Sequence, residues 1–123
     1  MKALTLRPQW AWAVAHSTKR VEYRSWMPRL AVGETLAIHA GSAKFWDDDL
    51  EEVQAAHGAM PPTELDGGAV VALAVVSELR SGVDGWEVHL ADVRTLKQPQ
   101  DCRGKLGLWS VPDDIAAACL ANV

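Results

Sequence analysis

The stretch KRVEYRSW, residues 19–26, alternates charged side chains along one face of a predicted strand, which either is solvated surface or lines a pocket for a base or phosphate. In an extended strand alternate side chains share a face, so Glu22, Arg24 and Trp26 point to one side. Lys19 points to the other side unless it precedes the strand, in the turn that leaves a preceding helix. We expect it to precede the strand, because Lys19 then reaches Glu22. A lysine and a carboxylate held close in a partly dry cleft can transfer protons, so Lys19 and Glu22 are the candidate catalytic residues.

The aromatic side chains and Arg24 supply what a bound base and phosphate require. Arg24 offers a cation for a phosphate or for developing negative charge, and an indole offers a flat wall on which a base stacks. The chain has six tryptophans against one Phe and one Tyr. Trp10 and Trp12 lie roughly 200° apart around a helix axis, so they do not share one narrow stripe, and one is expected to face a cleft. Trp10, Trp12, Trp26 and Arg24 are therefore candidate ligand-binding residues.

His39 ends a predicted strand and is followed by Gly41 and Ser42. A turn of small residues allows backbone amides to approach a ligand, which makes His39 and Ser42 further candidates for ligand binding. A structural histidine that hydrogen-bonds the neighbouring turn explains the same pattern. Both interpretations stay open from the sequence.

The remaining patterns argue against a metal or a cofactor. The four histidines, at 16, 39, 57 and 89, show no metal-ligand spacing, and Cys102 and Cys119 form no CxxC pair. The motifs GxGxxG, GxxxxGK[ST], HExxH and GxSxG are all absent. We expect no metal, no cofactor and reduced thiols.

Charge is unevenly distributed along the chain, although the formal net charge is only −4. Residues 1–44 hold seven Lys and Arg against two acids, residues 45–92 one against eleven, and residues 93–123 four against three. The net charge argues against a protein that coats nucleic acid by bulk phosphate neutralisation, but the two ends of the chain can still form a basic surface.

The length of 123 residues and the apolar share of 49% predict one domain, residues 1–123, with its own core. No apolar run approaches the ~20 residues of a membrane span, and the N-terminus has no signal-peptide pattern. We expect a soluble, cytoplasmic protein.

Hydrophobic periodicity predicts six strands and two or three peripheral helices, which describes an α+β fold with a small β-barrel. Pro8 suits the first turn of a helix, and Ser42 suits the cap of another that begins at Ala43 and presents Trp46, Leu50, Val53 and His57 along one stripe. The predicted strands are 2–6, one within 19–26 that Lys19 precedes, 35–40, 69–79, 86–96 and 107–111, and the helices are 8–16, one from 43 and one from 112. The nearly continuous apolar run 69–79 also fits a helix, so both assignments stay open for it.

Residues 4–26, LTLRPQWAWAVAHSTKRVEYRSW, resemble an ASCH domain, a small β-barrel family related to PUA domains. The most telling element of that family is G-x-K-x-x-E-x-R. Ser17, Lys19, Glu22 and Arg24 occupy its four fixed places, with serine in place of glycine. The resemblance continues through LAIHAG, GGAVVALAVV and VRTLKQPQDCRGKLGLWSV, and the last of these adds Lys105, in the late Gly-Lys of the family, to the ligand-binding candidates.

The resemblance implies a cleft beside the Lys-Glu-Arg motif and a role with RNA or modified nucleotides. Some relatives are amidohydrolases on acetylated cytidine, and single-strand ribonuclease activity is also associated with the family. In the amidohydrolase branch a threonine stands where this chain has Glu22. Three functions follow as hypotheses: a module that binds RNA or a modified nucleoside or nucleotide, a small hydrolase that uses Lys19 and Glu22, and a protein-interaction domain in transcription or translation control.

Overall fold

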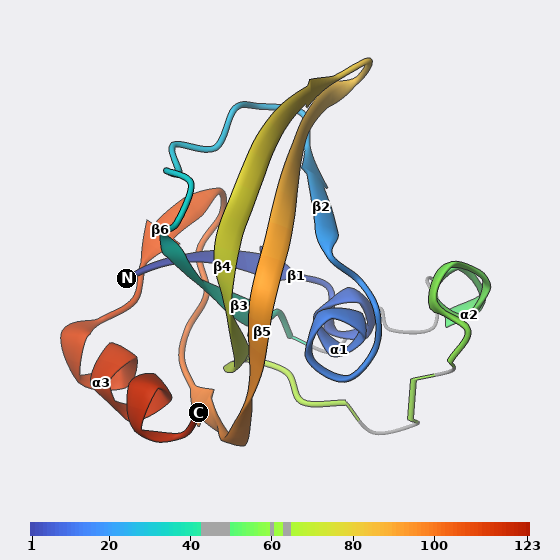
Figure 1. Cartoon of the computed structure of the whole chain (residues 1–123). Coiled ribbons are helices and arrows are strands. Elements are labelled where there is room, and N and C mark those ends of the chain that lie inside the picture. The colour runs from blue at the N-terminus through green and yellow to red at the C-terminus, as the bar shows by residue number, and fades with distance from the viewer. Residues whose placement is uncertain (43–49, 60, 63–64) are drawn as a thin grey trace.

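Six strands and three helices make up the computed structural model, which describes residues 1–42, 50–59, 61–62 and 65–123 (Figure 1). The elements follow the chain in the order β1 (Lys2–Leu6), α1 (Pro8–His16), β2 (Val21–Arg24), β3 (Thr35–Ala40), α2 (Leu50–His57), β4 (Ala69–Gly82), β5 (Gly85–Asp101), β6 (Leu108–Ser110) and α3 (Asp113–Ala121).

The six strands form one sheet in the order β2-β5-β4-β3-β1-β6. β1 and β3 are parallel, with Leu4 opposite Ile38, and every other neighbouring pair is antiparallel. The β4–β5 hairpin is long and shifts register at three places, and such bulges bend a strand and increase its twist. Figure 1 shows the hairpin crossing β1 and β3 steeply, so the sheet is strongly curled.

The α+β class and the count of six strands are confirmed, whereas the expected barrel is not closed. β2 and β6 are the two ends of the sheet, and no backbone pairing joins them in the described part of the chain. Both are short, with four and three residues, and neither extends far enough to complete a ring of hydrogen bonds. The curled sheet therefore has an open side, next to β2 and β1.

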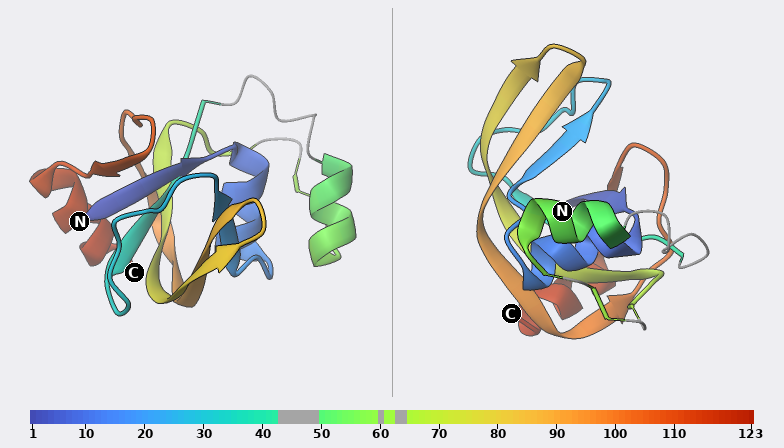
Figure 2. Two further views of the ribbon diagram at one scale, coloured as in Figure 1. Left: turned by 90° about the horizontal axis from the view of Figure 1, so that it is seen from above. Right: turned by 90° about the vertical axis from the view of Figure 1, so that its right-hand side faces the viewer.

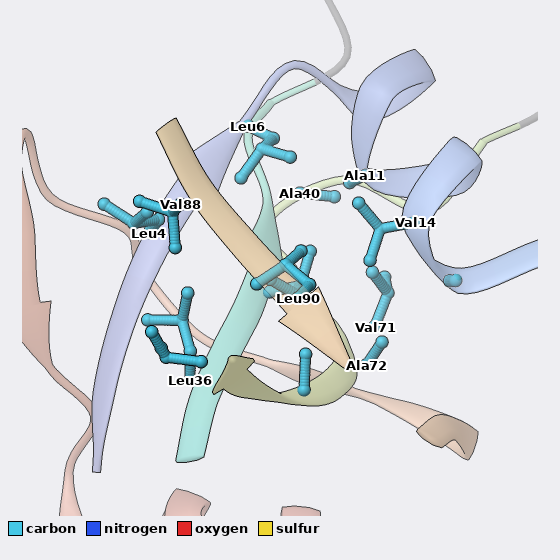
Figure 3. Packing of buried hydrophobic residues seen from close by; sticks show 14 of the residues in the cluster. Leu4, Leu6, Ala11, Val14, Leu36, Ala40, Val71, Ala72, Val88 and Leu90 are labelled. Carbon is cyan, nitrogen blue, oxygen red and sulfur yellow. The ribbon is translucent and has the colours of Figure 1, made fainter. Parts of the chain in front are cut away.

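The main core lies between the concave side of the sheet and α1. Ala11 and Val14 of α1 face side chains of the sheet such as Leu6 and Leu90 (Figure 3). Burying one such Leu or Val side chain stabilises the fold by about 1.5–3 kcal/mol, so this packing fixes where α1 sits. A second cluster, which includes Trp109 and Cys119, joins α3 to the other side of the sheet.

α2 lies against α1 and away from the sheet (Figure 2). Val53 is its buried residue, and His57 is its last. The expected helix start at Ala43, the cap by Ser42 and the position of Trp46 lie outside the described residues. No helix that the structure describes is both long and apolar enough to cross a membrane.

Candidate functional site

Lys19 lies in the turn between α1 and β2, as the sequence predicted, and meets Glu22 there. Its backbone N–H donates to the Ala13 carbonyl at 3.2 Å, which continues the hydrogen bonding of the last helical turn. Its Nζ lies 3.5 Å from Glu22 Oε1. Lys19 thus leaves the alternation of the strand and reaches the carboxylate from outside it.

Both side chains also bond to the backbone of β2, whose paired neighbour in the sheet is β5. Lys19 Nζ donates to the Val21 carbonyl at 2.7 Å, and the Tyr23 backbone N–H donates to Glu22 Oε1 at 3.2 Å. Edge strands present backbone groups that invite pairing with another chain. Lys19 and Glu22 occupy two of these groups, so the motif covers part of the open edge of the sheet.

The environment of Lys19 is partly aromatic and nearly closed to solvent. Its ammonium lies 5.0 Å from the ring centroid of Trp10 and 5.6 Å from that of Tyr23, and Lys19 is only 6% exposed. Burial lowers the pKa of Lys19 below its usual value, and the Glu22 charge opposes this shift. Burial is the larger of the two effects.

Arg24 connects the motif to the far side of the open gap. Its Nη2 donates to Glu22 Oε2 and to the Thr5 backbone carbonyl, both at 3.1 Å. Thr5 lies on β1, which does not pair with β2. Glu22 therefore holds Lys19 with one carboxylate oxygen and Arg24 with the other.

Three of the described clefts adjoin this motif. One of about 300 Å³ is lined by Tyr23, Arg24 and Trp86 among others, and the other two, named the larger and the smaller cleft, have volumes of about 990 Å³ and about 590 Å³. Arg24 belongs to the larger cleft, whereas Lys19 and Glu22 belong to the smaller one. The larger cleft is lined among others by Thr5, Arg24, Ser42, Asp101, Arg103 and Lys105, and the smaller by Trp10, Thr18, Lys19, Glu22, Tyr23 and His57.

His39 holds the wall of the larger cleft by hydrogen bonds from both ring nitrogens. Nε2 lies 2.6 Å from the Cys102 carbonyl, and Nδ1 lies 3.1 Å from Thr5 Oγ1. A carbonyl only accepts, so Nε2 carries the proton and Nδ1 accepts from the Thr5 hydroxyl. Burial lowers the pKa of His39, which is 1% exposed, and so favours this neutral form. Of the two interpretations from the sequence, the geometry supports the structural histidine.

Gly104 packs directly on His39 and Thr5. A Cβ at Gly104 would lie 2.6 Å from His39 Cε1 and 2.8 Å from Thr5 Oγ1, closer than carbon and oxygen atoms approach without displacement. The Trp109 indole N–H donates to the same Thr5 hydroxyl at 3.1 Å. These contacts hold the backbone of residues 102–105 in place, so the segment that carries Arg103 and Lys105 has a defined course.

The three tryptophan candidates occupy different places. Trp10 faces the smaller cleft, whereas Trp12 lies elsewhere on α1, with its ring 6.2 Å from that of His16. Trp10 and Trp12 thus lie on different sides of α1, and Trp12 lines a small pocket of about 20 Å³. Trp26 follows β2 and is 38% exposed, and its ring lies 4.0 Å from the position a Cβ would take at Gly107, on the wall of the larger cleft.

The structure divides the predicted site residues between the clefts and adds others. Ser42 and Lys105 join Arg24 in the larger cleft, while Lys19, Glu22 and Trp10 line the smaller one. The lining residues that sequence reasoning missed include Thr5, Tyr23, His57 and Arg103. Two of them had a local signal, since Arg103 stands directly before Gly104 and Lys105, and His57 ends the apolar stripe predicted for the helix from Ala43. Nowhere in the described ranges do three potential metal ligands come together.

Fold and site together define a class of protein. It is a small α+β domain with a curled, open sheet, in which cation-lined clefts lie on both sides of a Lys-Glu-Arg motif. The model of the ASCH domain family matches residues 4–111, and the chain belongs to that family.

Solved structures support the same fold. The chain is similar to the crystal structure of ASCH from Zymomonas mobilis, with a TM-score of 0.65 at 12% identity over 98% of this chain and 93% of that one. Two crystal structures of single-substitution variants of the Zymomonas mobilis protein give TM-scores of 0.65 and 0.61, again at 12% identity, over 98% of this chain and 96% and 94% of theirs. A search of curated proteins found no match. At this identity the likeness concerns the fold alone.

Proposed function

We propose that this ASCH domain binds single-stranded RNA or a nucleotide, with a phosphate group held in the larger cleft. The observation that carries the proposal is the meeting of three cationic side chains, Arg24, Arg103 and Lys105, in one cleft of about 990 Å³. Asp101 is the one acidic residue among its described lining residues. Arginine and lysine side chains bind phosphate through charge-assisted hydrogen bonds, and an arginine can donate two at once.

A glycine of the cleft supports the same proposal. Gly107 leaves the backbone uncovered, since a Cβ there would meet only the Trp26 ring at 4.0 Å, so a ligand can approach the main chain at this residue. The exposed Leu106 and the Trp26 ring beside Gly107 provide apolar surface near the cations. A phosphate between cations with apolar surface alongside is the arrangement that nucleotides require.

Fluorescence anisotropy with a labelled single-stranded hexaribonucleotide, at 50 and 200 mM salt, tests the proposal. The double variant Arg103→Ala/Lys105→Ala is expected to raise Kd at least tenfold at 50 mM salt. It should also reduce the slope of log Kd against log salt by about 1.4, because each phosphate contact on a single strand contributes roughly 0.7. Wild-type protein that does not bind RNA, mononucleotide or nucleoside at 50 mM salt overturns the proposal.

The matched control removes two cations outside both clefts. Arg94 and Lys97 are exposed residues of β5, and Arg94→Ala/Lys97→Ala makes the same change in net charge. Binding should stay within twofold of wild type in this variant. An equal loss in both double variants would mean that net charge, and not the cleft, governs binding.

A hydrolase is the second candidate function, and the buried Lys19–Glu22 pair favours it. Burial lowers the pKa of Lys19, and a neutral lysine amine can act as a general base. Incubation with acylated nucleosides and with labelled single-stranded RNA, for wild type and Lys19→Met, tests this function. Turnover that is lost in a folded Lys19→Met protein supports an enzyme, whereas absence of turnover in the wild type rejects this candidate.

A further inference from the structure

The two clefts meet at one carboxylate. Glu22 Oε1 lies 3.5 Å from Lys19 Nζ, which lines the smaller cleft, and Glu22 Oε2 lies 3.1 Å from Arg24 Nη2, which lines the larger. One carboxylate thus separates the cations of the two clefts. A ligand larger than one nucleotide can reach from one cleft into the other across the Glu22–Arg24 pair.

The larger cleft presents charge that is available to a ligand. Arg103 and Lys105 are exposed, and neither forms an ion pair with any residue that the structure describes. Among the residues that the structure describes, Arg24 has one carboxylate partner, Glu22, and its guanidinium has further N–H donors. This cleft is therefore suited to phosphate.

The smaller cleft presents aromatic rings beside a lysine that already has partners. Lys19 already bonds to Val21 and Glu22, and the indole of Trp10 and the phenol ring of Tyr23 lie near its ammonium. Tyr23 is 63% exposed, so its ring is open to a stacking partner. Arg20 also lines this cleft and is exposed, and its Nη1 donates to the Val14 and Lys19 carbonyls. An exposed aromatic ring beside a lysine that already has partners is suited to stacking with a nucleobase.

We infer that the two clefts bind one ligand together: a single-stranded oligonucleotide of at least two nucleotides, with a phosphate in the larger cleft and a neighbouring base on Tyr23 in the smaller. The inference rests on the proposed function and narrows it, because a free nucleoside or mononucleotide fills only one of the two clefts. Glu22 and Arg24 then lie beneath the sugar–phosphate link between the two nucleotides.

A pair of probes with equal charge tests the inference by isothermal titration calorimetry. The first is the 5′-phosphorylated diadenylate, and the second has the same backbone with the base of one nucleotide removed, prepared once for each position. Wild-type protein is expected to bind the full dinucleotide about tenfold more tightly than one of the two abasic forms, since stacking of one base on an aromatic side chain has this magnitude.

Variants assign that preference to the smaller cleft. Tyr23→Ala should weaken binding of the full dinucleotide about tenfold. It should leave within twofold the binding of the abasic form that wild-type protein binds more weakly, because that form already lacks the stacked base. Tyr23→Phe keeps the ring and should bind both probes like wild type. Arg103→Ala should weaken binding of both probes. Leu120→Ala, an exposed apolar residue of α3 outside both clefts, is the control and should change neither.

The outcomes separate the inference from the function on which it rests. If neither base removal nor Tyr23→Ala affects binding while Arg103→Ala weakens it, a phosphate-binding cleft remains and the two-cleft inference is overturned. If Tyr23→Ala weakens the full and abasic probes equally, the ring does not stack on a base and the inference is again overturned. If no probe binds at 50 mM salt, the proposed function and the inference both fail.

Discussion

Arg24 on β2 donates a hydrogen bond of 3.1 Å from its guanidinium to the backbone carbonyl of Thr5 on β1, although the two strands do not pair in the sheet. The side chain thus bridges the open side of the curled sheet, where a closed barrel would have backbone hydrogen bonds. The same guanidinium lines the larger cleft. Arg24 therefore contributes to the stability of the fold and to the lining of the larger cleft, and substitutions of Arg24 test both roles.

Arg24→Lys should lower the free energy of unfolding by about 2 kcal/mol, because a lysine lacks the planar fork that reaches Thr5 and Glu22 together and hydrogen bonds to charged groups contribute about this much. Urea denaturation followed by circular dichroism measures the change. Arg80→Lys is the control, since Arg80 pairs with Glu78 on exposed surface and such pairs contribute little. Equal losses in the two variants would contradict a bridging role for Arg24.

Glu22→Ala should lower the free energy of unfolding by about 3 kcal/mol, because it leaves the Lys19 ammonium buried without its counter-charge. The double variant Lys19→Met/Glu22→Ala should lose less than the two single losses combined, since no unpaired buried charge remains. Chemical denaturation of wild type, Lys19→Met, Glu22→Ala and the double variant gives the coupling free energy between the two residues. Additive losses in the free energy of unfolding would show that Lys19 and Glu22 act independently. Glu78→Ala, at an exposed ion pair, is the control and should change the free energy of unfolding by less than about 1 kcal/mol.

Gly104→Ala should destabilise the fold by about 1–3 kcal/mol, since the new methyl group would overlap the His39 ring and the Thr5 hydroxyl. RNA binding should weaken as well, because the displaced backbone carries Arg103 and Lys105. Thermal unfolding and anisotropy on the same samples measure both effects. Gly82→Ala offers a control in the β4–β5 hairpin, where a Cβ meets only the Gly85 carbonyl at an ordinary 3.6 Å.

Stability should fall as the pH drops below about 6.5. Burial lowers the pKa of both His39 and His57 in the folded protein, and Lys19 and Arg20 add to the lowering at His57. In the pH range between the lowered folded pKa and the ordinary value of 6.5, the unfolded chain binds more protons, so acid favours unfolding.

Urea midpoints at pH 7.5 and 5.5 measure this dependence. His39→Gln and His57→Gln should each reduce the difference between the two midpoints, and the double variant should reduce it further. Wild-type midpoints that are equal at the two pH values would contradict the lowered pKa of these two histidines in the folded protein.

Local pattern was sufficient for most of the fold. Pro8 and the run of apolar residues after it predicted α1 to its last residue, and the β-branched stretch from Ala69 predicted the buried β4. The position of Lys19 ahead of β2 also followed from local geometry, because strand alternation placed it on the wrong face for Glu22. These features depend on residues close in sequence, whose side-chain periodicity records the local backbone conformation.

The arrangement of the site was decided by tertiary structure. Nothing near Arg24 in sequence indicates that it reaches Thr5, and His39 meets Cys102 across 63 positions. Such contacts depend on strand order and register, which hydrophobic periodicity does not encode. The open side of the sheet, where a closed barrel was expected, depends on strand order and register in the same way. The sequence by itself therefore determined the helices, the strands and the charged motif. Only the curled sheet decided that Glu22 lies between two clefts, because this position depends on how β2 approaches β1, which is distant from it in the sheet.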